Sequence, residues 1–355
     1  MKRSPADLVR EEILALKAYH VAPAAGMIKL DAMENPYRLP QPLREEIGRI
    51  VSTLAINRYP DPEAPELKGR LREVFGIPSE AGLLIGNGSD EIITMVAQTL
   101  ARPGAVMLAP EPSFAMYRMS ALFTRMLYVG IPLNRDFTLD AGRFLDAIAE
   151  HRPALTFIAY PNNPTGGLFP EDAVARIIEA ATGFVVVDEA YHVFARKTFM
   201  TRLGEFPNLM VMRTVSKLGL AGVRLGYAAA APEWVREFDK VRPPYNVSVL
   251  AQFVAERLLA HIGALEQQAE RIRSERATLL EHLHDLRGVD AFPSEANFIL
   301  VRVPDADAVH ERMKARRILV RNFNGSHPLL ANCLRLTVGT PGENQLMLDA
   351  LTASL

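Results

Sequence analysis

The sequence predicts an α/β protein whose larger part contains a mostly parallel sheet with helices on both faces. Short, wholly apolar runs recur from about residue 82 onward, and amphipathic helical patterns alternate with them. Strands that are apolar on both faces are typical of parallel sheets covered by helices. Near residue 245 the pattern changes, and a length of 355 residues favours two domains over one compact core.

Four apolar runs predict strands of the large sheet, at residues 105–110, 155–161, 183–190 and 209–214. Between two of them, residues 170–181 predict a crossover helix with one apolar face, formed by Val174, Ile177, Ile178 and Ala181. Strands joined by crossover helices run parallel. Ligands of such sheets bind beyond the carboxyl ends of the strands, so polar residues that follow these runs are candidate site residues.

The organisation changes at residues 241–246, where two prolines interrupt the pattern. About forty residues of predicted helix follow, and then a strand, a helix, two strands and a closing helix. This order indicates a smaller α+β unit. We therefore expect a large domain over residues 41–245 and a small C-terminal domain over residues 246–355. We expect the N-terminal segment, residues 1–40, to join the small domain.

The composition is that of an ordinary globular enzyme. Apolar residues make up 49% and charged residues 23%, and 40 basic against 41 acidic residues leave a net charge of −1. This balance argues against nucleic acid or an anionic membrane as partner. The single cysteine, Cys333, excludes an intrachain disulfide and fits a reducing compartment. The first twenty residues contain neither a signal peptide nor a spanning helix, so we expect a cytoplasmic protein.

Lys217 and Asp188 are the first candidates for a catalytic site. Lys217 follows an apolar run and is succeeded by apolar residues, a neighbourhood that lowers the pKa of a lysine. Asp188 ends the run FVVV. Most isolated lysines are solvated, and an acid after a strand often caps the next helix. Together, however, they match pyridoxal phosphate, which binds a lysine as a Schiff base and needs an Asp at its pyridine nitrogen.

Tyr191 and Asn163 add a phenol and an amide to this pair. Tyr191 lies three residues after Asp188, and Asn163 lies in the turn PNNPTG, residues 161–166. Both can donate a hydrogen bond to the phenolic oxygen of the cofactor. The turn alone carries little information, because two prolines and a glycine make an ordinary turn.

A phosphate site is predicted at the glycine turn GNGSDE, residues 86–91, which leads into a helical pattern. Free backbone N–H groups at this helix start would bind the phosphate, from Gly88, Ser89 and Asp90. We expect the Asp90 side chain to cap the helix. Hydroxyls and a cation near the lysine would complete the site, from Thr214, Ser216 and Arg224. The turn is not a P-loop, because no GK[ST] follows it.

These motifs occur in order along nearly the whole chain and resemble the fold-type I, pyridoxal-phosphate-dependent class-II aminotransferases. Within that family the likeness is greatest to the histidinol-phosphate aminotransferases. It rests on KLDAMENPY, RYPDP, GNGSDE, PSFAMY, PNNPTG, VVVDEAY, TVSKLGLAGVRLGY, ANFILVRV, ILVRNF and CLRLTVGTPGEN. The resemblance implies a mostly parallel seven-stranded sheet sandwiched by helices, a smaller α+β domain, and pyridoxal 5′-phosphate as cofactor.

The resemblance also implies roles for individual residues. Lys217 is expected to form the Schiff base and shuttle a proton, Asp188 to face the pyridinium, and Asn163 with Tyr191 to bind the phenolate. Phe114 is expected to stack on the cofactor face, where many members of the family have tyrosine. Tyr59 is expected to reach across a homodimer to the neighbouring cofactor phosphate, so that the two active sites are shared.

Substrate binding is expected, again from the resemblance, at Arg335, Arg321, Tyr19 and Asn35. The two guanidinium groups suit the carboxylate of glutamate and the phosphate of histidinol phosphate. Without the resemblance, a pair of exposed strand arginines is the more ordinary interpretation. His20, His192 and His327 have no partner at metal-ligand spacing, so we expect no metal site.

The implied reaction is transamination between L-histidinol phosphate and 2-oxoglutarate, giving imidazole acetol phosphate and glutamate in histidine biosynthesis. Three alternatives remain at this point. An aromatic amino acid aminotransferase would keep the cofactor residues and change only the substrate pocket. A related threonine-phosphate decarboxylase would release carbon dioxide, and a non-catalytic, cofactor-binding regulatory module would not need Lys217.

Overall fold

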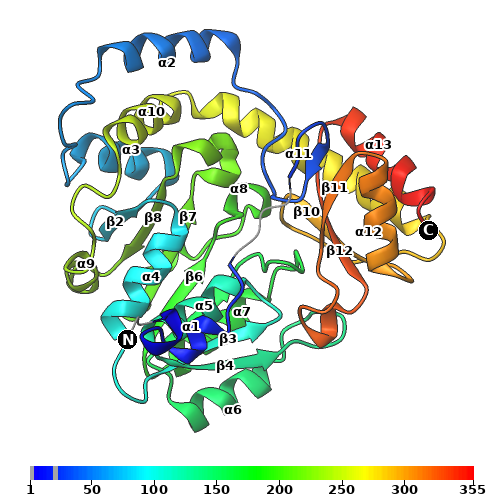
Figure 1. Cartoon of the computed structure of the whole chain (residues 1–355). Coiled ribbons are helices and arrows are strands. Elements are labelled where there is room, and N and C mark those ends of the chain that lie inside the picture. The colour runs from blue at the N-terminus through cyan, green and yellow to red at the C-terminus, as the bar shows by residue number, and fades with distance from the viewer. Residues whose placement is uncertain (1–3, 19–22) are drawn as a thin grey trace.

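A seven-stranded sheet forms the centre of the larger part of the molecule in the computed structural model, which describes residues 4–18 and 23–355 (Figure 1). The strand order is β2-β8-β7-β6-β5-β3-β4. Only β8 runs against its neighbours β2 and β7, and the strands from β7 to β4 pair in parallel. The bounds are β2 Gly82–Gly86, β3 Val106–Glu111, β4 Leu127–Pro132, β5 Leu155–Ala159, β6 Phe184–Asp188, β7 Leu209–Thr214 and β8 Gly226–Ala230.

The four predicted strands correspond to β3, β5, β6 and β7, and the last three of these are buried at every residue. The sequence prediction did not name β2, β4 or β8. In β8 a glycine, a tyrosine and three alanines replace the branched residues that favour strands, so its own sequence is a weak signal. β4 lies at the edge of the sheet and is only partly buried, which removes the continuous apolar run.

Helices cover both faces of this sheet because strand side chains alternate between the faces. Val185 and Val187 belong to one core cluster, with α3 (Pro65–Phe75), α6 (Ala141–His151), α7 (Glu171–Ala180) and α10 (Val249–Leu259). Phe184 and Val186 belong to another, with α4 (Ser89–Leu100), α5 (Ala115–Thr124) and α9 (Pro232–Asp239). The prediction of a mostly parallel, helix-covered sheet is confirmed.

A second sheet of five strands, in the order β1-β11-β12-β10-β9, lies beside the first (Figure 1). Its bounds are β1 Ile28–Leu30, β9 Asp290–Ala291, β10 Phe298–Arg302, β11 Ile318–Asn322 and β12 Cys333–Thr337. The core of this unit includes residues from α11 (Ile262–His284), α12 (Ala306–Ala315) and α13 (Pro341–Thr352). The N-terminal strand β1 pairs with β11, so residues 28–30 lie in the smaller sheet.

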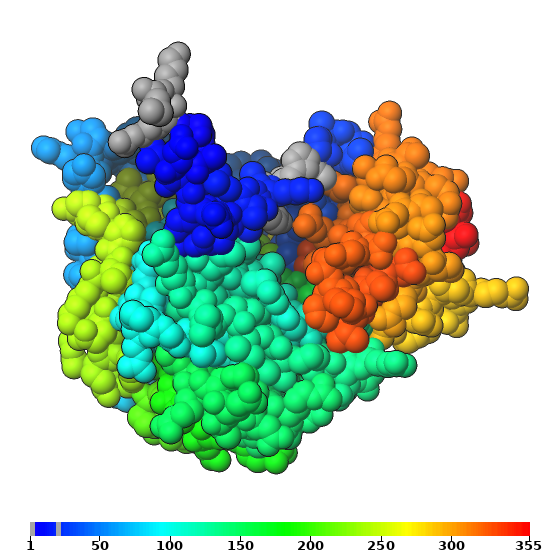
Figure 2. All heavy atoms as spheres, turned by 60° about the horizontal axis from the view of Figure 1, so that its bottom comes forward, coloured from blue at the N-terminus to red at the C-terminus, as the bar shows by residue number. Residues whose placement is uncertain are grey.

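The remaining elements connect these two parts. α10 contacts α2 and α3, and α11 extends from there toward the smaller sheet (Figure 1). The described N-terminal residues before the gap at 19–22 lie on the surface of the larger part of the molecule (Figure 2). Arg10 there donates to the carbonyl of Phe123 in α5. The domain limits at residues 40 and 245 stay predictions. The other helical segments are Pro5–Asp7, α1 Glu11–Leu14, α2 Gln41–Thr53, α8 His192–Ala195, Met200–Arg202, Ser216–Leu220, Ala221–Val223 and Pro328–Leu330.

A membrane-spanning helix is absent from the described part of the chain, because none of its helices is both long and apolar enough.

Candidate active site

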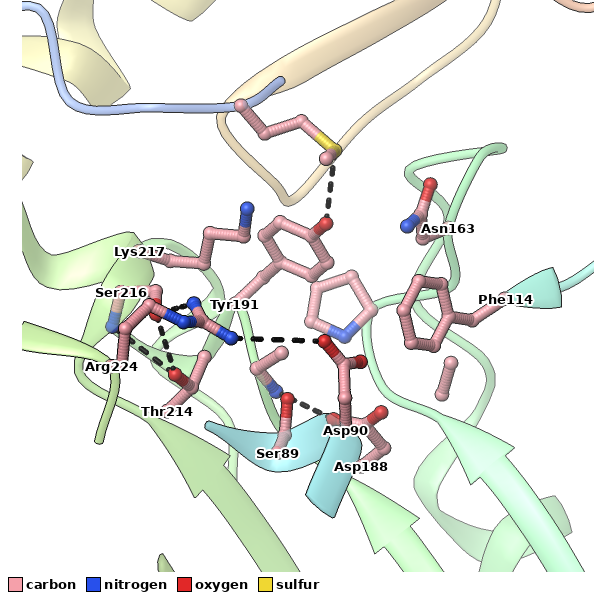
Figure 3. Close-up of a pocket in the computed structure, with 14 residues that line it drawn as sticks. Ser89, Asp90, Phe114, Asn163, Asp188, Tyr191, Thr214, Ser216, Lys217 and Arg224 are labelled. Atoms are coloured by element: carbon pink, nitrogen blue, oxygen red, sulfur yellow. Dashed lines mark hydrogen bonds and ion pairs between the residues drawn. The ribbon is translucent and has the colours of Figure 1, made fainter. Parts of the chain in front are cut away.

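A pocket at the carboxyl ends of the parallel strands brings together residues that are distant in the sequence (Figure 3). Asp188 ends β6, Thr214 ends β7, and Asn163 follows β5. Because these strands are parallel neighbours, their carboxyl ends meet at one edge of the sheet. The sequence-predicted residues that line the pocket are Ser89, Asp90, Phe114, Asn163, Asp188, Tyr191, Thr214, Ser216, Lys217 and Arg224.

Lys217 projects into this pocket from the helical turn that follows β7 (Figure 3). Its Nζ donates to the carbonyl oxygen of Ala32 at 3.2 Å and lies 5.8 Å from the centre of the Tyr191 ring. Burial first, and then the positive charge of Arg335, lower the pKa of Lys217 to about 8. A larger fraction of the amine is therefore neutral and nucleophilic near neutral pH.

Asp188 is a buried carboxylate, with 4% of its surface exposed. Its Oδ2 accepts a hydrogen bond from the Tyr117 hydroxyl at 2.7 Å, and its Oδ1 accepts one from the Ala190 backbone N–H at 3.1 Å. Burial raises the pKa of Asp188 to about 6, although both hydrogen bonds act in the opposite direction. Asp188 thus has an apolar environment and two donors that favour its charged form.

Tyr117 is a site residue to which the sequence analysis gave no role. It is fully buried on α5 and stacks on Phe157, with ring centres 4.5 Å apart and planes 7° apart. It lies three residues after Phe114, and the two rings meet edge-to-face. This i, i+3 spacing at a helix start was a visible signal that the residues share a face. Its partner Asp188, however, is 71 residues away and could not be read from spacing.

The pocket has a second end, at the N-terminus of α4, where hydrogen-bond donors and a guanidinium converge. The Arg224 guanidinium lies 3.5 Å from the Ser216 hydroxyl oxygen and 3.8 Å from Asp90 Oδ2. Thr214 Oγ1 lies 3.0 Å from the same Ser216 oxygen. A guanidinium, two hydroxyls and a helix N-terminus are donors that fit a phosphate group.

Gly88 occupies the N-cap position of α4 with φ of 82°, a conformation that favours glycine. A Cβ at Gly88 would lie 2.5 Å from Arg224 Nη2, so a side chain there would displace the guanidinium from its present position. The expectation that Asp90 caps this helix is wrong, because Asp90 is the second helical residue and contacts Arg224 instead. The turn thus leaves the helix start open toward the pocket.

Arg335 and Asn163 lie together at the side of the pocket opposite the N-terminus of α4. Arg335 is 4% exposed, and its Nη1 donates to Asn163 Oδ1 at 2.6 Å. Its Nη2 donates to the Asp31 carbonyl at 2.8 Å, and the rings of Phe298 and Phe323 lie about 5 Å from its guanidinium. The hydrogen bond from Arg335 orients the amide of Asn163 so that its nitrogen faces the pocket (Figure 3).

The other predicted residues lie outside the pocket lining. Arg321 pairs with Arg335 across β11 and β12. Asn35 donates to the Leu218 carbonyl and to the Gln268 side chain, and so stabilises the helical turn Ser216–Leu220 that contains Lys217. Tyr59 is 80% exposed and stacks on Tyr245. Tyr19 lies outside the described residues, as does His20. Four further residues, none of them predicted as a site residue from the sequence, complete the lining: Met33, Ala159, Pro161 and Ala190.

Comparisons with known proteins identify the family. A family model described as aminotransferase class I and II matches residues 25–351. The chain is 56% identical to a histidinol-phosphate aminotransferase of Chromobacterium violaceum, over 99% of both chains. It is 52% identical to histidinol-phosphate aminotransferase 2 of Cupriavidus pinatubonensis, over 98% of this chain and 96% of that one.

Among solved structures, the chain is similar to a histidinol-phosphate aminotransferase from Sinorhizobium meliloti in complex with pyridoxal-5′-phosphate. The TM-score is 0.87 and the identity 26%, over 98% of this chain and 97% of that one. The family resemblance read from the ordered motifs is therefore confirmed.

The Tyr117–Asp188 hydrogen bond gives a first testable prediction. In Tyr117→Phe, Asp188 loses a donor that lowers its pKa, so that pKa rises and the carboxylate is protonated nearer neutral pH. We expect affinity for pyridoxal phosphate to fall about tenfold, the scale of one hydrogen bond to a charged group. Fluorescence titration of the cofactor-free protein measures this. Tyr128→Phe, on β4 outside the pocket lining, is the matched control; equal effects of both changes would contradict the prediction.

The buried lysine gives a second prediction. Because the pKa of Lys217 is lowered from 10.5 to about 8, its neutral amine accumulates as pH rises through about 8. An aldehyde and borohydride label the amine of Lys217 in the cofactor-free protein, and peptide mapping measures the labelling rate at each pH. This rate should rise with pH with a midpoint near 8. Arg335→Met removes a like charge, so the midpoint should move upward. A wild-type midpoint near 10.5 would refute the effect of burial.

Proposed function

The chain belongs to the class I and II aminotransferases, and we propose that it transfers an amino group between L-histidinol phosphate and 2-oxoglutarate, giving imidazole acetol phosphate and glutamate. This reaction is a step of histidine biosynthesis. The observation that carries the proposal is a buried amine, Lys217, in one pocket with a buried carboxylate, Asp188, and beside an arginine, Arg335. Full-length relatives named as histidinol-phosphate aminotransferases support the choice of substrate.

The residues of the pocket fit pyridoxal phosphate. When bound, this cofactor supplies an aldehyde that reacts with amines and an electron-poor ring that stabilises negative charge on a neighbouring carbon. In this proposal Lys217 Nζ holds the aldehyde, and Asp188 keeps the pyridine nitrogen protonated. Asn163 and Tyr191 donate to the phenolic oxygen, and Phe114 stacks on the ring.

The phosphate end of the proposal rests on the α4 N-terminus. The cradle consists of the backbone N–H groups of Ser89 and Asp90 and the side chains of Thr214, Ser216 and Arg224. Gly88 lies beside them at the helix start, but its N–H donates to the Gly86 carbonyl at 2.9 Å, so the expectation that this N–H is free for the phosphate is wrong. In this proposal Asp90 contributes its N–H, and its carboxylate holds the Arg224 guanidinium in place. The close approach of Gly88 to that guanidinium supports the assignment, because a side chain there would fill the cradle.

Proton transfer is assigned to Lys217. The neutral amine of Lys217 would act as the base that removes the proton from the substrate carbon that bears nitrogen. The lowered pKa suits this role, because a general base must be unprotonated at the working pH. The Ala32 carbonyl, 3.2 Å from Nζ, orients the amine within the pocket.

Substrate anions are assigned to Arg335, with Arg321 beside it in the paired strand. The planar guanidinium of Arg335 can bind either the carboxylate of glutamate or the phosphate of histidinol phosphate. Its position beside Asn163 supports this assignment, since Asn163 lines the pocket. Tyr19 remains a proposed contributor to the same substrate site. Asn35 would contribute to it indirectly, through the Leu218 carbonyl beside Lys217 to which its amide donates.

We further propose a homodimer in the cytoplasm. Tyr59 stacks on Tyr245 with ring centres 4.4 Å apart, and it is 80% exposed although aromatic. Ile56, Leu250 and Phe253 are further exposed apolar residues. A second copy of the chain would cover such residues, and Tyr59 would then reach the phosphate of its partner's cofactor. The single cysteine supports a reducing compartment.

The function is tested by adding histidinol phosphate to the cofactor-loaded, yellow protein. We expect rapid loss of the yellow absorbance and release of imidazole acetol phosphate, and 2-oxoglutarate should restore the colour with formation of glutamate. Rapid conversion by phenylalanine without any conversion by histidinol phosphate would instead establish an aromatic amino acid aminotransferase.

Lys217→Ala should abolish turnover, because the amine that holds the aldehyde and moves the proton is removed. The cofactor should still bind noncovalently through the phosphate cradle. Steady-state assay and dialysis of the coloured protein measure the two effects separately. Full activity of this variant would disprove the assigned role.

Hybrid dimers test whether Tyr59 acts across the interface. Tyr59→Phe is expected to weaken cofactor binding about tenfold through loss of a hydrogen bond to a charged phosphate. When Tyr59→Phe and Lys217→Ala protomers are mixed, the hybrid contains one site with both Lys217 and Tyr59, provided that Tyr59 comes from the partner. That site should regain wild-type affinity. A hybrid without this recovery would place Tyr59 in its own protomer's site.

A further inference from the structure

Three consecutive residues, Asp31, Ala32 and Met33, form a strap over the active-site pocket. The Asp31 carbonyl accepts from Arg335 at 2.8 Å, and the Ala32 carbonyl accepts from Lys217 at 3.2 Å. Met33 Sδ lies 3.1 Å from the Tyr191 hydroxyl and accepts its hydrogen bond, drawn as a dashed line in Figure 3. When that hydroxyl donates to a bound cofactor instead, the thioether is left as an apolar surface at the pocket. The strap therefore extends from the anion-binding arginine to the catalytic lysine.

The Met33 backbone is fixed in an unusual conformation. Its φ is 55°, in the left-handed region that methionine seldom adopts. Its N–H donates to the Thr337 hydroxyl at 3.1 Å, and its carbonyl accepts from the Asn297 amide at 3.0 Å. Thr337 and Asn297 are both buried in the smaller sheet unit. Such a conformation persists only where the surroundings determine it, so the direction of the side chain is determined as well.

Of the three strap residues, only Met33 lines the pocket. Asp31 and Ala32 contact Arg335 and Lys217 through their backbone carbonyl oxygens. A thioether is a weak acceptor but a polarizable apolar surface that packs well against ring edges. Ala159, Pro161 and Ala190 add small apolar groups to the lining. Between the lysine and the arginine, the strap thus offers a substrate one bulky apolar contact.

We propose that Met33 is a specificity-determining residue that packs against the imidazole ring of the phosphorylated substrate and contributes little to binding of glutamate. The inference rests on the proposed function, in which one site must accept both substrates. Each substrate places an amine at Lys217 and an anion at Arg335, next to the strap. They differ in the third substituent, which is an aromatic ring in one and a charged carboxylate chain in the other.

The experiment compares Met33→Ala and Met33→Leu with the wild-type holoenzyme. Each half-reaction is followed alone by the absorbance of the bound cofactor, with histidinol phosphate or with glutamate as amino donor. Met33→Ala should lower kcat/KM for histidinol phosphate about tenfold, as expected for lost apolar contact, and that for glutamate less than about twofold. Met33→Leu retains apolar bulk, so the ratio of the two kcat/KM values should stay near the wild-type ratio.

Met27→Ala is the matched control. Met27 is another half-buried methionine, but it precedes β1 and lies in a different surface hollow, beside Arg316 and Arg317. It should leave the ratio unchanged. Equal losses with both substrates in Met33→Ala, or no loss with either, would overturn the inference while the proposed function stands. A wild-type enzyme that does not convert histidinol phosphate would overturn both.

Discussion

The active site depends on the burial of two ionisable groups, Lys217 and Asp188, at one edge of a parallel sheet. Removing charges from water is unfavourable, so burial favours the neutral form of each group. It lowers the pKa of Lys217 to about 8 and raises the pKa of Asp188 to about 6. The protein limits this effect at Asp188 with two hydrogen bonds and at Lys217 with one backbone carbonyl. The pocket therefore holds groups whose protonation changes near neutral pH, as proton transfer requires.

A buried ion pair between Glu189 and Arg213 stabilises the segment that follows Asp188. Glu189 follows Asp188 directly, and because strand residues alternate it belongs to the opposite side of the sheet. It pairs with Arg213 at 2.8 Å and accepts from the Thr198 hydroxyl and the Phe199 backbone N–H. These contacts hold both ends of the segment that contains Tyr191. The two adjacent acids thus have separate roles. Asp188 faces the pocket, and Glu189 anchors the segment that contains Tyr191.

Sequence patterns predicted those parts of the fold that local physics determines. Apolar runs identified β3, β5, β6 and β7, and ordered motifs led to the residues at their carboxyl ends. The patterns missed β8, whose alanines gain strand structure only from pairing with β2 and β7. They also missed the roles of Tyr117 and Met33, because contacts across 71 and 158 residues leave no trace in local spacing. The hydrogen bond from Asn35 to the Leu218 carbonyl, across 183 residues, could not be predicted from local spacing either.

The contacts of Asp31 and Ala32 do not depend on the identity of their side chains. Both residues reach Arg335 and Lys217 through main-chain oxygens, which every amino acid possesses. Scanning mutagenesis would exchange their side chains and leave these acceptors in place, so a silent scan would not mean that the positions are inert. Replacing the relevant amide with a backbone ester, whose carbonyl is a poorer acceptor, is the chemical change that would reveal them.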